Sequence, residues 1–145
     1  MIRIMTIDDY EQVYSLWVNT PGMGLNNLDD SGEGISKYLA RNPNTCFVAE
    51  KNGRIVGAIL SGHDGRRGSI SHTVVAQSEQ RQGIGEALVN TAMAAFENEG
   101  IHKVNLVVFA RNESGNVFWE RLGFTTREDL IYRNKTITDF TRIDT

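Results

Sequence analysis

The stretch from Ser71 to Glu86 constrains the fold of this chain more than any other. A run of β-forming residues, 70–75, passes through a short polar loop into Gly83 and Gly85, where an amphipathic helix starts. A glycine-rich turn at the start of a helix presents unpaired backbone N–H groups at the positive end of the helix dipole. The sequence therefore predicts a strand, a phosphate-binding loop and a helix in succession.

Two common phosphate-binding loops do not fit the spacing. The chain has no Gly-Lys-Ser or Gly-Lys-Thr run, which a P-loop requires. A dinucleotide-binding loop needs a third glycine where Leu88 stands and an acidic residue about twenty positions farther on, but residues 103–108 read KVNLVV. A third pattern, Gln/Arg-x-x-Gly-x-Gly/Ala, is satisfied by Gln80, Gly83 and Gly85.

A second motif lies one helix and one strand farther along the chain. Residues 112–124 read NESGNVFWERLGF: an asparagine, a helix with an aromatic residue, then Leu-Gly-Phe. With both motifs in this order and at this separation, the sequence resembles the GNAT superfamily of acyl-CoA-dependent N-acetyltransferases, as a small bacterial-type member. The resemblance covers residues 2–135. It implies a single N-acetyltransferase domain over residues 1–145, of α/β (α+β) class, with a central mixed, mostly antiparallel sheet flanked by helices in the order β-α-α-β-β-β-α-β-α-β-β.

Local patterns place the elements along the chain. Apolar periodicity predicts helices over residues 8–19, 35–41, 83–98 and 113–122. Strands are predicted over residues 2–5, 46–51, 54–62, 69–75, 103–109, 124–127 and 130–134. We expect a type I′ hairpin turn at Asn52-Gly53, a turn at Asp64-Gly65, and a mobile loop over residues 22–34. The strand over residues 103–109 is expected to be buried on both faces.

Composition narrows the class of protein. At 145 residues the chain fits one domain, and a net charge of −3 argues against nucleic acid or an anionic membrane as the main partner. No apolar run approaches the ~20 residues of a membrane span, and the N-terminus lacks the apolar core of a signal peptide. Cys46 is the only cysteine, which excludes an internal disulfide and suits a reducing compartment. We therefore expect a cytoplasmic protein.

The resemblance implies acetyl-CoA as the acyl donor and no metal. The pyrophosphate would lie against backbone N–H groups of the glycine loop, and the pantetheine arm between strand 73–76 and strand 104–109. In the family a backbone N–H polarises the thioester carbonyl, here that of Val74 or Val75. The donor-binding residues implied in this sequence are Val74, Val75, Ala76, Gln80, Arg81, Gln82, Gly83, Ile84, Gly85, Glu86, Asn112, Gly115, Asn116 and Trp119.

The implied reaction is direct attack of an amine on the thioester in a ternary complex. A primary amine with a pKa near 10 is mostly protonated at neutral pH, so a base or a water chain must remove its proton. His72 and Asp64 are the candidates for this base. Strand alternation groups His72 with Ile70 and Val74 on one face unless a β-bulge intervenes, so alternation does not settle which face meets the substrate. The alternatives are cross-strand packing for His72 and turn formation for Asp64.

The position where many family members carry a proton-donating tyrosine is occupied by Trp119. An indole N–H donates a hydrogen bond but does not titrate usefully, so the acid that protonates the leaving thiolate is left to Tyr132 or to a water molecule.

The leading hypothesis is transfer of acetyl from acetyl-CoA to a primary amine of a small molecule, peptide or protein. The alternative is a non-catalytic CoA-binding regulatory module of the same fold, which the loss of the tyrosine favours. Transfer of a different acyl group is a third option. By resemblance, acceptor contacts come from residues 21–42 and the last strands, and a homodimer through the C-terminal strands is left open.

Overall fold

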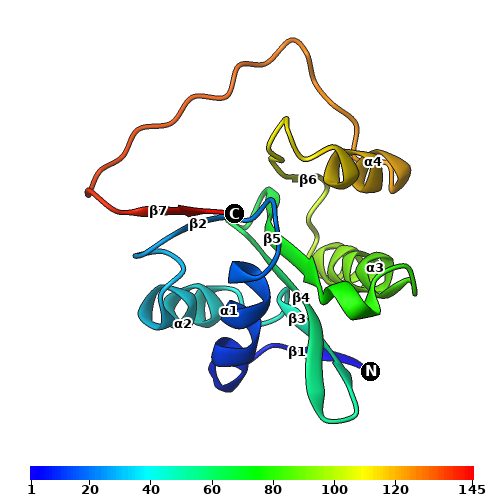
Figure 1. The fold of residues 1–145 in the computed structure, drawn as a ribbon. Coiled ribbons are helices and arrows are strands. Elements are labelled where there is room, and N and C mark those ends of the chain that lie inside the picture. Colours follow the sequence, from blue (N-terminus) through cyan, green and yellow to red (C-terminus); the bar gives the residue numbers. More distant parts are fainter.

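A five-stranded mixed sheet forms the centre of the molecule (Figure 1). The computed structural model describes residues 1–145. The strands in spatial order are β1 (Ile2–Ile4), β3 (Phe47–Lys51), β4 (Arg54–His63), β5 (Gly68–Val75) and β6 (Val104–Asn105). The first four pair antiparallel, and β6 joins β5 in parallel. The expected mixed, mostly antiparallel sheet is therefore confirmed.

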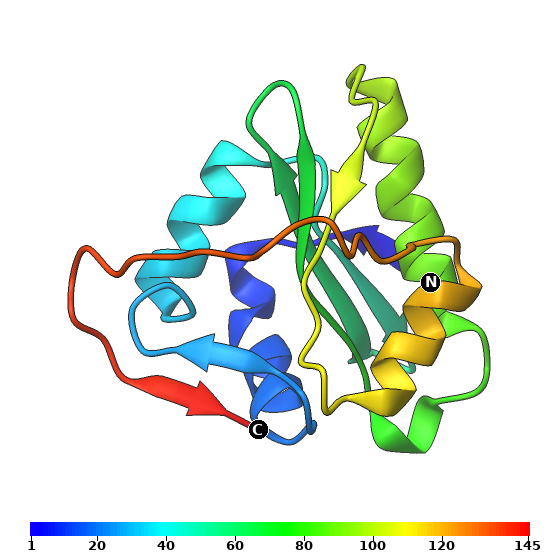
Figure 2. The same ribbon diagram turned by 90° about the horizontal axis from the view of Figure 1, so that it is seen from above.

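Four helices flank the sheet, two on each face (Figures 1 and 2). They are α1 (Tyr10–Val18), α2 (Gly32–Arg41), α3 (Ile84–Asn98) and α4 (Glu113–Arg121). Single-turn 3-10 helices, η1 (Ile7–Asp9) and η2 (Gln77–Glu79), precede α1 and α3. Helices α1 and α2 cover one face, and α3 and α4 cover the other.

Each face of the sheet has its own hydrophobic cluster. On the α1 side, Trp17 and Ile35 are fully buried against the sheet. On the α3 side, Leu88 and Phe96 pack on Ile59 of β4. Because burying a side chain of this size stabilises a fold by about 1.5–3 kcal/mol, these residues hold the helices to the two faces.

The predicted turns between the central strands are present. Asn52 and Gly53 have φ values of 54° and 76°, as a type I′ turn requires, and they join Lys51 of β3 to Arg54 of β4. Gly65, with φ of 91°, completes the turn between β4 and β5. These turn residues set the antiparallel order of the central strands.

The region expected to be a mobile loop, residues 22–34, is instead structured. β2 (Gly24–Asn26) pairs antiparallel with β7 (Arg142–Asp144) in a separate two-stranded sheet. Helix α2 begins at residue 32 because the Ser31 hydroxyl accepts a hydrogen bond from the Gly34 N–H at 3.0 Å. The sequence carries this capping signal, but the high Gly, Asn and Asp content obscures it.

The end of the chain differs most from the expectation. Residues 124–141, here called the C-terminal segment, contain neither of the two strands predicted at 124–127 and 130–134. Figure 1 shows this segment as a long arc from α4 to β7. Leu130, Ile131 and Tyr132 are 61%, 76% and 71% exposed. An apolar run becomes a strand only where a partner accepts its backbone hydrogen bonds, and no strand of this chain pairs with it.

The strand predicted over residues 103–109 is short for the same reason. It pairs with β5 only at Val104 and Asn105, and Val107 is 73% exposed, so the expected burial on both faces is wrong. Figure 2 shows the chain leaving the sheet after β6 on its way to α4. A gap therefore opens beside the second half of β5.

A β-bulge in β5 changes which side chains share a face. Ile70 pairs with Ser61 and His72 with Leu60, so Ser71 is one extra residue. Ile70 packs in the α3-side cluster, whereas His72 packs on Trp17 of α1. The predicted grouping of Ile70 with His72 is therefore wrong, because the bulge shifts the alternation by one residue.

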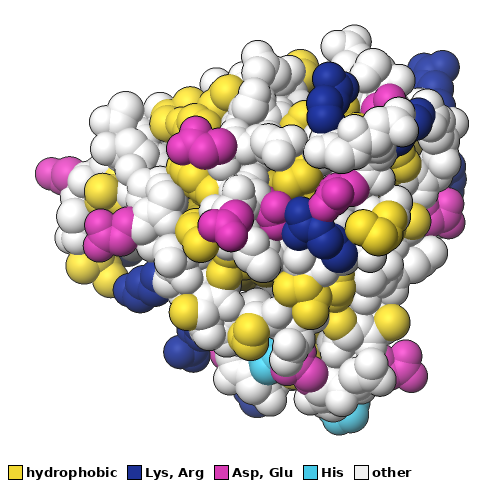
Figure 3. All heavy atoms as spheres, turned by 90° about the horizontal axis from the view of Figure 1, so that it is seen from below, with side chains coloured by type: hydrophobic (Ala, Val, Ile, Leu, Met, Phe, Trp, Pro, Cys, Tyr) yellow, Lys and Arg dark blue, Asp and Glu magenta, His cyan; other side chains and the backbone are white.

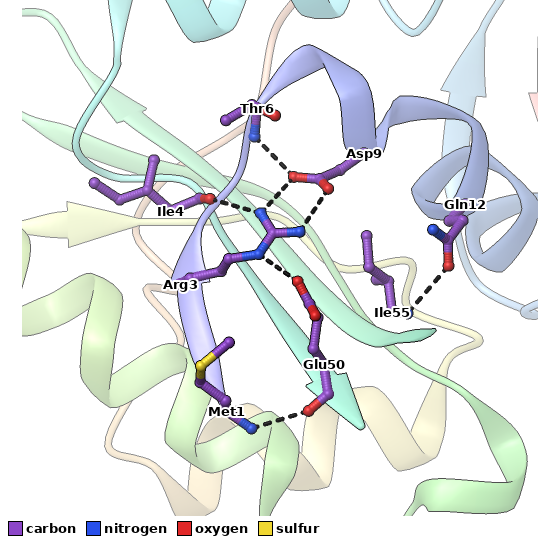
Figure 4. Close-up of polar contacts among 8 residues, drawn as sticks. All are labelled: Met1, Arg3, Ile4, Thr6, Asp9, Gln12, Glu50 and Ile55. Carbon is purple, nitrogen blue, oxygen red and sulfur yellow. Dashed lines mark hydrogen bonds and ion pairs between the residues drawn. The ribbon is translucent and has the colours of Figure 1, made fainter. Parts of the chain in front are cut away.

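The edge strand β1 is fixed by a charged network around Arg3 (Figure 4). The Arg3 guanidinium donates to both Asp9 carboxylate oxygens, at 2.9 and 2.8 Å, and to Glu50. The Thr6 N–H also donates to Asp9, at 2.9 Å. Burial alone raises the pKa of Asp9, but the hydrogen bonds from Arg3 and Thr6 outweigh it and hold that pKa below its ordinary value. The network therefore ties β1 to the start of α1 and to β3.

Acidic and basic side chains lie interspersed with apolar ones on the face drawn in Figure 3. No continuous patch of one sign covers that face.

Candidate functional site

A large cleft opens where β5 and the chain after β6 diverge. Its volume is about 1500 Å³. Its walls come from β5, the loop before α3, residues 106–110, the start of α4 and part of the C-terminal segment. The predicted site residues that line it are His72, Val74, Val75, Gln80, Arg81, Gly83, Ile84, Gly85, Glu86, Asn112, Gly115, Trp119 and Tyr132.

One end of the cleft presents a row of backbone donors. None of the six N–H groups from Arg81 to Glu86 has a hydrogen-bond acceptor within the chain, and the first bonded amide of this helix is that of Ala87, which donates to the Gly83 carbonyl at 3.0 Å. Arg81 and Gly83 have φ values of 66° and 81°, in the left-handed region. Alternation of left- and right-handed residues turns successive N–H groups toward one point and forms an anion-binding concavity.

The loop fits a diphosphate chemically. A positive φ at a non-glycine residue costs of order 1–2 kcal/mol, and such strain concentrates at ligand sites, which suits Arg81. Gly83 has open space around an added Cβ, so its glycine is required by backbone angle rather than by packing. The 15-residue helix α3 adds its positive end to the loop, and Glu86 is the acidic side chain in its first turn.

The free edge of β5 faces the gap. The Ala76 N–H donates to Val56 of β4 at 2.7 Å, so strand alternation directs the backbone groups of Val75 the other way. The Val75 carbonyl accepts from Gln80 Nε2 at 3.1 Å. The sequence leaves Val74 and Val75 as alternative donors to the thioester carbonyl. In the structure the Val75 N–H points into the gap, whereas the Val74 N–H points toward β4.

Asn112 fixes the opposite wall. Its Oδ1 accepts from the Gly115 N–H at 3.0 Å and caps α4. A Cβ at Gly115 would lie 2.4 Å from Asn112 Nδ2, so this position is kept free of a side chain. Asn116 Nδ2 donates to the carbonyls of Phe109 and Asn112, at 3.1 and 2.8 Å. Asn116 thus holds the turn and does not line the cleft.

Trp119 packs between two aromatic rings at the cleft wall. The ring centroids of Phe118 and Phe124 lie 5.0 and 5.1 Å from that of Trp119, both edge-to-face. The indole therefore forms a rigid part of the wall.

His72 lies at the cleft wall, and its side chain contacts Asp30 and Trp17. Its Nε2 lies 2.8 Å from Oδ1 of Asp30, and its ring packs edge-to-face on Trp17 at 4.9 Å. Asp30 sits in the turn before α2 and is buried. Its other oxygen, Oδ2, accepts from the Asn26 N–H at 2.9 Å.

Of the remaining predicted site residues, one lines the cleft and three lie outside it. Tyr132 lines the cleft from the C-terminal segment. Asp64 lies outside it: Oδ1 accepts from the Arg66 and Arg67 N–H groups at 2.8 and 2.7 Å, and these bonds lower the pKa of its carboxyl. Ala76 packs against the α3-side cluster. Like Ala76, Gln82 is not among the cleft-lining residues.

Some cleft residues carry no signal in the sequence. Residues 19–26 form one wall, and a Cβ at Gly22 would lie 2.6 Å from Asn112 Nδ2. A Cβ at Gly24 would lie 3.3 Å from Phe109. These close approaches, which only the tertiary fold reveals, bring Gly22 and Gly24 against Asn112 and Phe109. Asp30 lies within residues 21–42, from which the resemblance implies acceptor contacts, but no sequence pattern singles out Asp30 or Trp17.

No three His, Cys, Asp or Glu side chains come close enough together to hold a metal ion. None of the helices has both the length and the apolar character needed to cross a membrane.

A row of unpaired N–H groups at a helix start, beside an open strand edge, defines a class of site that can hold a phosphate-bearing ligand. Comparison with known families narrows this class. Residues 10–124 match the acetyltransferase (GNAT) family. An acetyltransferase of Pectobacterium atrosepticum is 31% identical over 138 residues, covering 95% of this chain and 96% of that protein. One from Yersinia pestis (strain Pestoides F) is 30% identical with the same coverage. The chain therefore belongs to the GNAT family and is an acetyltransferase of the EC 2.3.1 class.

Solved structures share the fold at lower identity. An aminoglycoside 6′-N-acetyltransferase from Acinetobacter haemolyticus has a TM-score of 0.74 at 14% identity, covering 95% of this chain and 99% of that one. A ribosomal-protein-alanine N-acetyltransferase from Brucella melitensis has a TM-score of 0.67 at 16% identity, covering 94% and 99%. At these identities the likeness shows the fold, which confirms the expected α+β GNAT class.

Proposed function

We propose that this protein transfers an acetyl group from acetyl-CoA to a primary amine of a small molecule, peptide or protein, by direct attack in a ternary complex. The observation that carries the proposal is the row of six unpaired N–H groups from Arg81 to Glu86 beside an open strand edge. Acetyl-CoA, when bound, supplies a thioester whose acetyl group passes to the amine as the thiolate leaves. The N–H groups of the loop would hold the diphosphate, and the Val75 N–H would polarise the carbonyl.

Two measurements test this proposal. Calorimetry with CoA is expected to show binding at micromolar to millimolar concentration. Thiol release from acetyl-CoA is then measured with a panel of amines: an aminoglycoside and an alanine-initiated peptide, after the fold relatives, and a polyamine. We expect release above the amine-free rate with at least one of them. Binding of CoA without release across the panel would instead support the non-catalytic regulatory module.

We propose His72 as the base that removes the amine proton. Of the three catalytic candidates, it alone lies on β5 beside the gap and is fixed by a carboxylate. His72 is three residues from Val75, roughly 10 Å along a strand, so the proton passes through an intervening water. His72→Ala is expected to lower kcat about 100-fold or more. A pH–rate profile and kcat equal to wild type would end this assignment.

Tyr132 is the proposed source of the proton for the leaving thiolate, with a water as its alternative. It lines the cleft and its hydroxyl is free of hydrogen bonds within the chain. Tyr132→Phe is expected to lower kcat with an unchanged Kd for CoA; an unchanged kcat assigns the role to water.

We also propose that the chain forms a homodimer through the C-terminal segment. Leu130, Ile131 and Ile137 are exposed there, and no strand of the chain pairs with them. A second copy can supply both an apolar surface and backbone partners. Sedimentation is expected to give a dimer for the wild type and a monomer for Ile131→Asp; a monomeric wild type would contradict the proposal.

A further inference from the structure

Asp30 and His72 form a buried pair that joins two distant parts of the chain. Their side chains are 6% and 10% exposed, and Nε2 lies 2.8 Å from Oδ1. Asp30 comes from the turn between β2 and α2, and His72 from the bulged part of β5. Trp17 packs on the imidazole ring. The ring is therefore held from two sides, by a carboxylate and by an indole.

The two ring nitrogens have different surroundings. Nε2 faces Asp30, whereas Nδ1 makes no hydrogen bond within the chain and is not among the enclosed polar atoms that lack a partner. Nδ1 is thus not fully enclosed, in a residue that lines the cleft. A carboxylate accepts hydrogen bonds only, so a neutral imidazole beside it carries its proton on Nε2. That tautomer leaves a lone pair on Nδ1.

We propose that Asp30 is a positioning residue: it holds His72 in the Nε2–H tautomer so that Nδ1 faces the cleft as a proton acceptor. This inference rests on the proposed role of His72 as the base. When Nδ1 takes a proton, the ring becomes an imidazolium, and the Asp30 carboxylate stabilises that charge without itself taking the proton.

The charged side chains of α1 and α2 are exposed, and three titratable groups packed in the cluster on this side are neutral at neutral pH. Tyr10 donates from its hydroxyl to the Asp30 carbonyl at 2.7 Å, and burial raises its pKa. Burial also raises the pKa of Tyr38 and of Cys46 to about 12. Asp30 is therefore the charged group in contact with His72.

The tautomer can be read directly. Imidazole ¹⁵N chemical shifts of the wild type are expected to show His72 protonated on Nε2 and unprotonated on Nδ1 at a pH where the ring is neutral, with His72→Gln used for assignment. This measurement needs no acceptor and is made on the wild type, the variant serving only to assign the resonances. A wild-type His72 protonated on Nδ1 would overturn the proposal.

Asp30→Asn reverses the polarity of this contact with little change in shape. The single amide oxygen of the variant is needed by the Asn26 N–H, which now bonds Oδ2, so the NH₂ group faces Nε2. His72 must then accept on Nε2 and carry its proton on Nδ1. We expect the ¹⁵N shifts to exchange and kcat to fall about 100-fold with an unchanged KM for acetyl-CoA. Asp29→Asn is the matched control, because Asp29 contacts Asn26 and not His72.

Kinetics with the best amine of the panel separate this inference from the proposed function. Equal kcat for His72→Ala and the double variant His72→Ala/Asp30→Asn is expected, since Asp30 acts through His72. Suppose that His72→Ala inactivates the enzyme but Asp30→Asn keeps the wild-type kcat and the wild-type tautomer. That result would overturn the positioning role of Asp30 and leave His72 as the base. Wild-type kcat in His72→Ala would overturn the assignment of the base.

Discussion

At the scale of single residues, Trp119 shows how a wall residue differs from a catalytic one. Its indole is clamped edge-to-face by Phe118 and Phe124 and lines the cleft. An indole has no proton to give at neutral pH. We therefore propose that Trp119 contributes the shape of the cleft wall and not a proton.

Replacing Trp119 by Phe tests this assignment. Phe keeps an aromatic ring between Phe118 and Phe124, so we expect kcat within about fivefold of wild type and a small loss of stability. Steady-state thiol release and CoA calorimetry measure both quantities. A fall in kcat of several orders of magnitude with CoA binding intact would contradict the role as a wall.

Substitution of Gly83 can separate the effect of a negative charge at the loop from the effect of backbone strain. Both Gly83 and Gly65 have positive φ and open space for a Cβ, but only Gly83 lies at the phosphate-binding loop. Gly83→Glu places a carboxylate beside the expected diphosphate, so we expect CoA binding to weaken about 100-fold or more, which is ~2.7 kcal/mol. Gly65→Glu carries the same backbone strain and is expected to keep wild-type affinity. Wild-type CoA affinity in Gly83→Glu would refute the loop as the diphosphate site.

At the scale of elements, the start of α4 depends on one cap. Gly115→Ala would place a Cβ 2.4 Å from Asn112 Nδ2 and displace the capping side chain. Loss of a cap costs about 0.5–2 kcal/mol, so we expect chemical denaturation to show a loss in this range and CoA affinity to fall. Val117→Ala, at an exposed position of the same helix away from the cleft, is the control and is expected to stay within about 0.5 kcal/mol. Equal stability of the two variants would exclude the cap as the reason for the glycine.

Elements with local signals were predictable from the sequence. The turn at Asn52-Gly53 and the start of α4 after Asn112 each have a chemical cause within a few residues. The strands predicted over residues 124–127 and 130–134 are absent, because a strand forms only with a partner, and the whole fold decides which partners are available. The same holds for β2, which needs β7 from more than a hundred residues away.

The donor side of the site was more predictable than the acceptor side. Gln80, Gly83 and Asn112 belong to short motifs that are visible in the sequence, and the structure brings them to one cleft. Asp30 and His72 meet from positions 42 residues apart. Their contact also depends on the bulge at Ser71, for which no sequence pattern is diagnostic.

At the scale of the whole molecule, the Arg3 network links stability to pH. Asp9 has a pKa below its ordinary value of 3.8, so the unfolded chain binds more protons than the folded one in the window just below pH 3.8. Its stabilisation is therefore present above that pH and is lost as the pH falls through the lower, folded pKa.

Arg3→Met is expected to destabilise the protein by about 1–2 kcal/mol at pH 7, since Asp9 loses a charged partner. The difference from wild type is expected to shrink as the pH falls from 3.8 through the lowered pKa of Asp9, because Asp9 then becomes protonated in both proteins. Urea unfolding at neutral pH and over this acidic range measures this. Arg54→Met is the control, because Arg54 is exposed and has no ion pair. A difference independent of pH would show that Arg3 acts through packing alone.

The extra residue at Ser71 has a consequence for how such enzymes diversify. Residues 72–75, downstream of it, pair regularly with β4, and loss of the extra residue would move the side chains on one side of Ser71 to the other face of the sheet. Under the proposed function, the side chains near the amine can therefore change while the loop proposed to hold coenzyme A keeps its sequence. A single-residue deletion library at this point is a direct route to altered substrate preference.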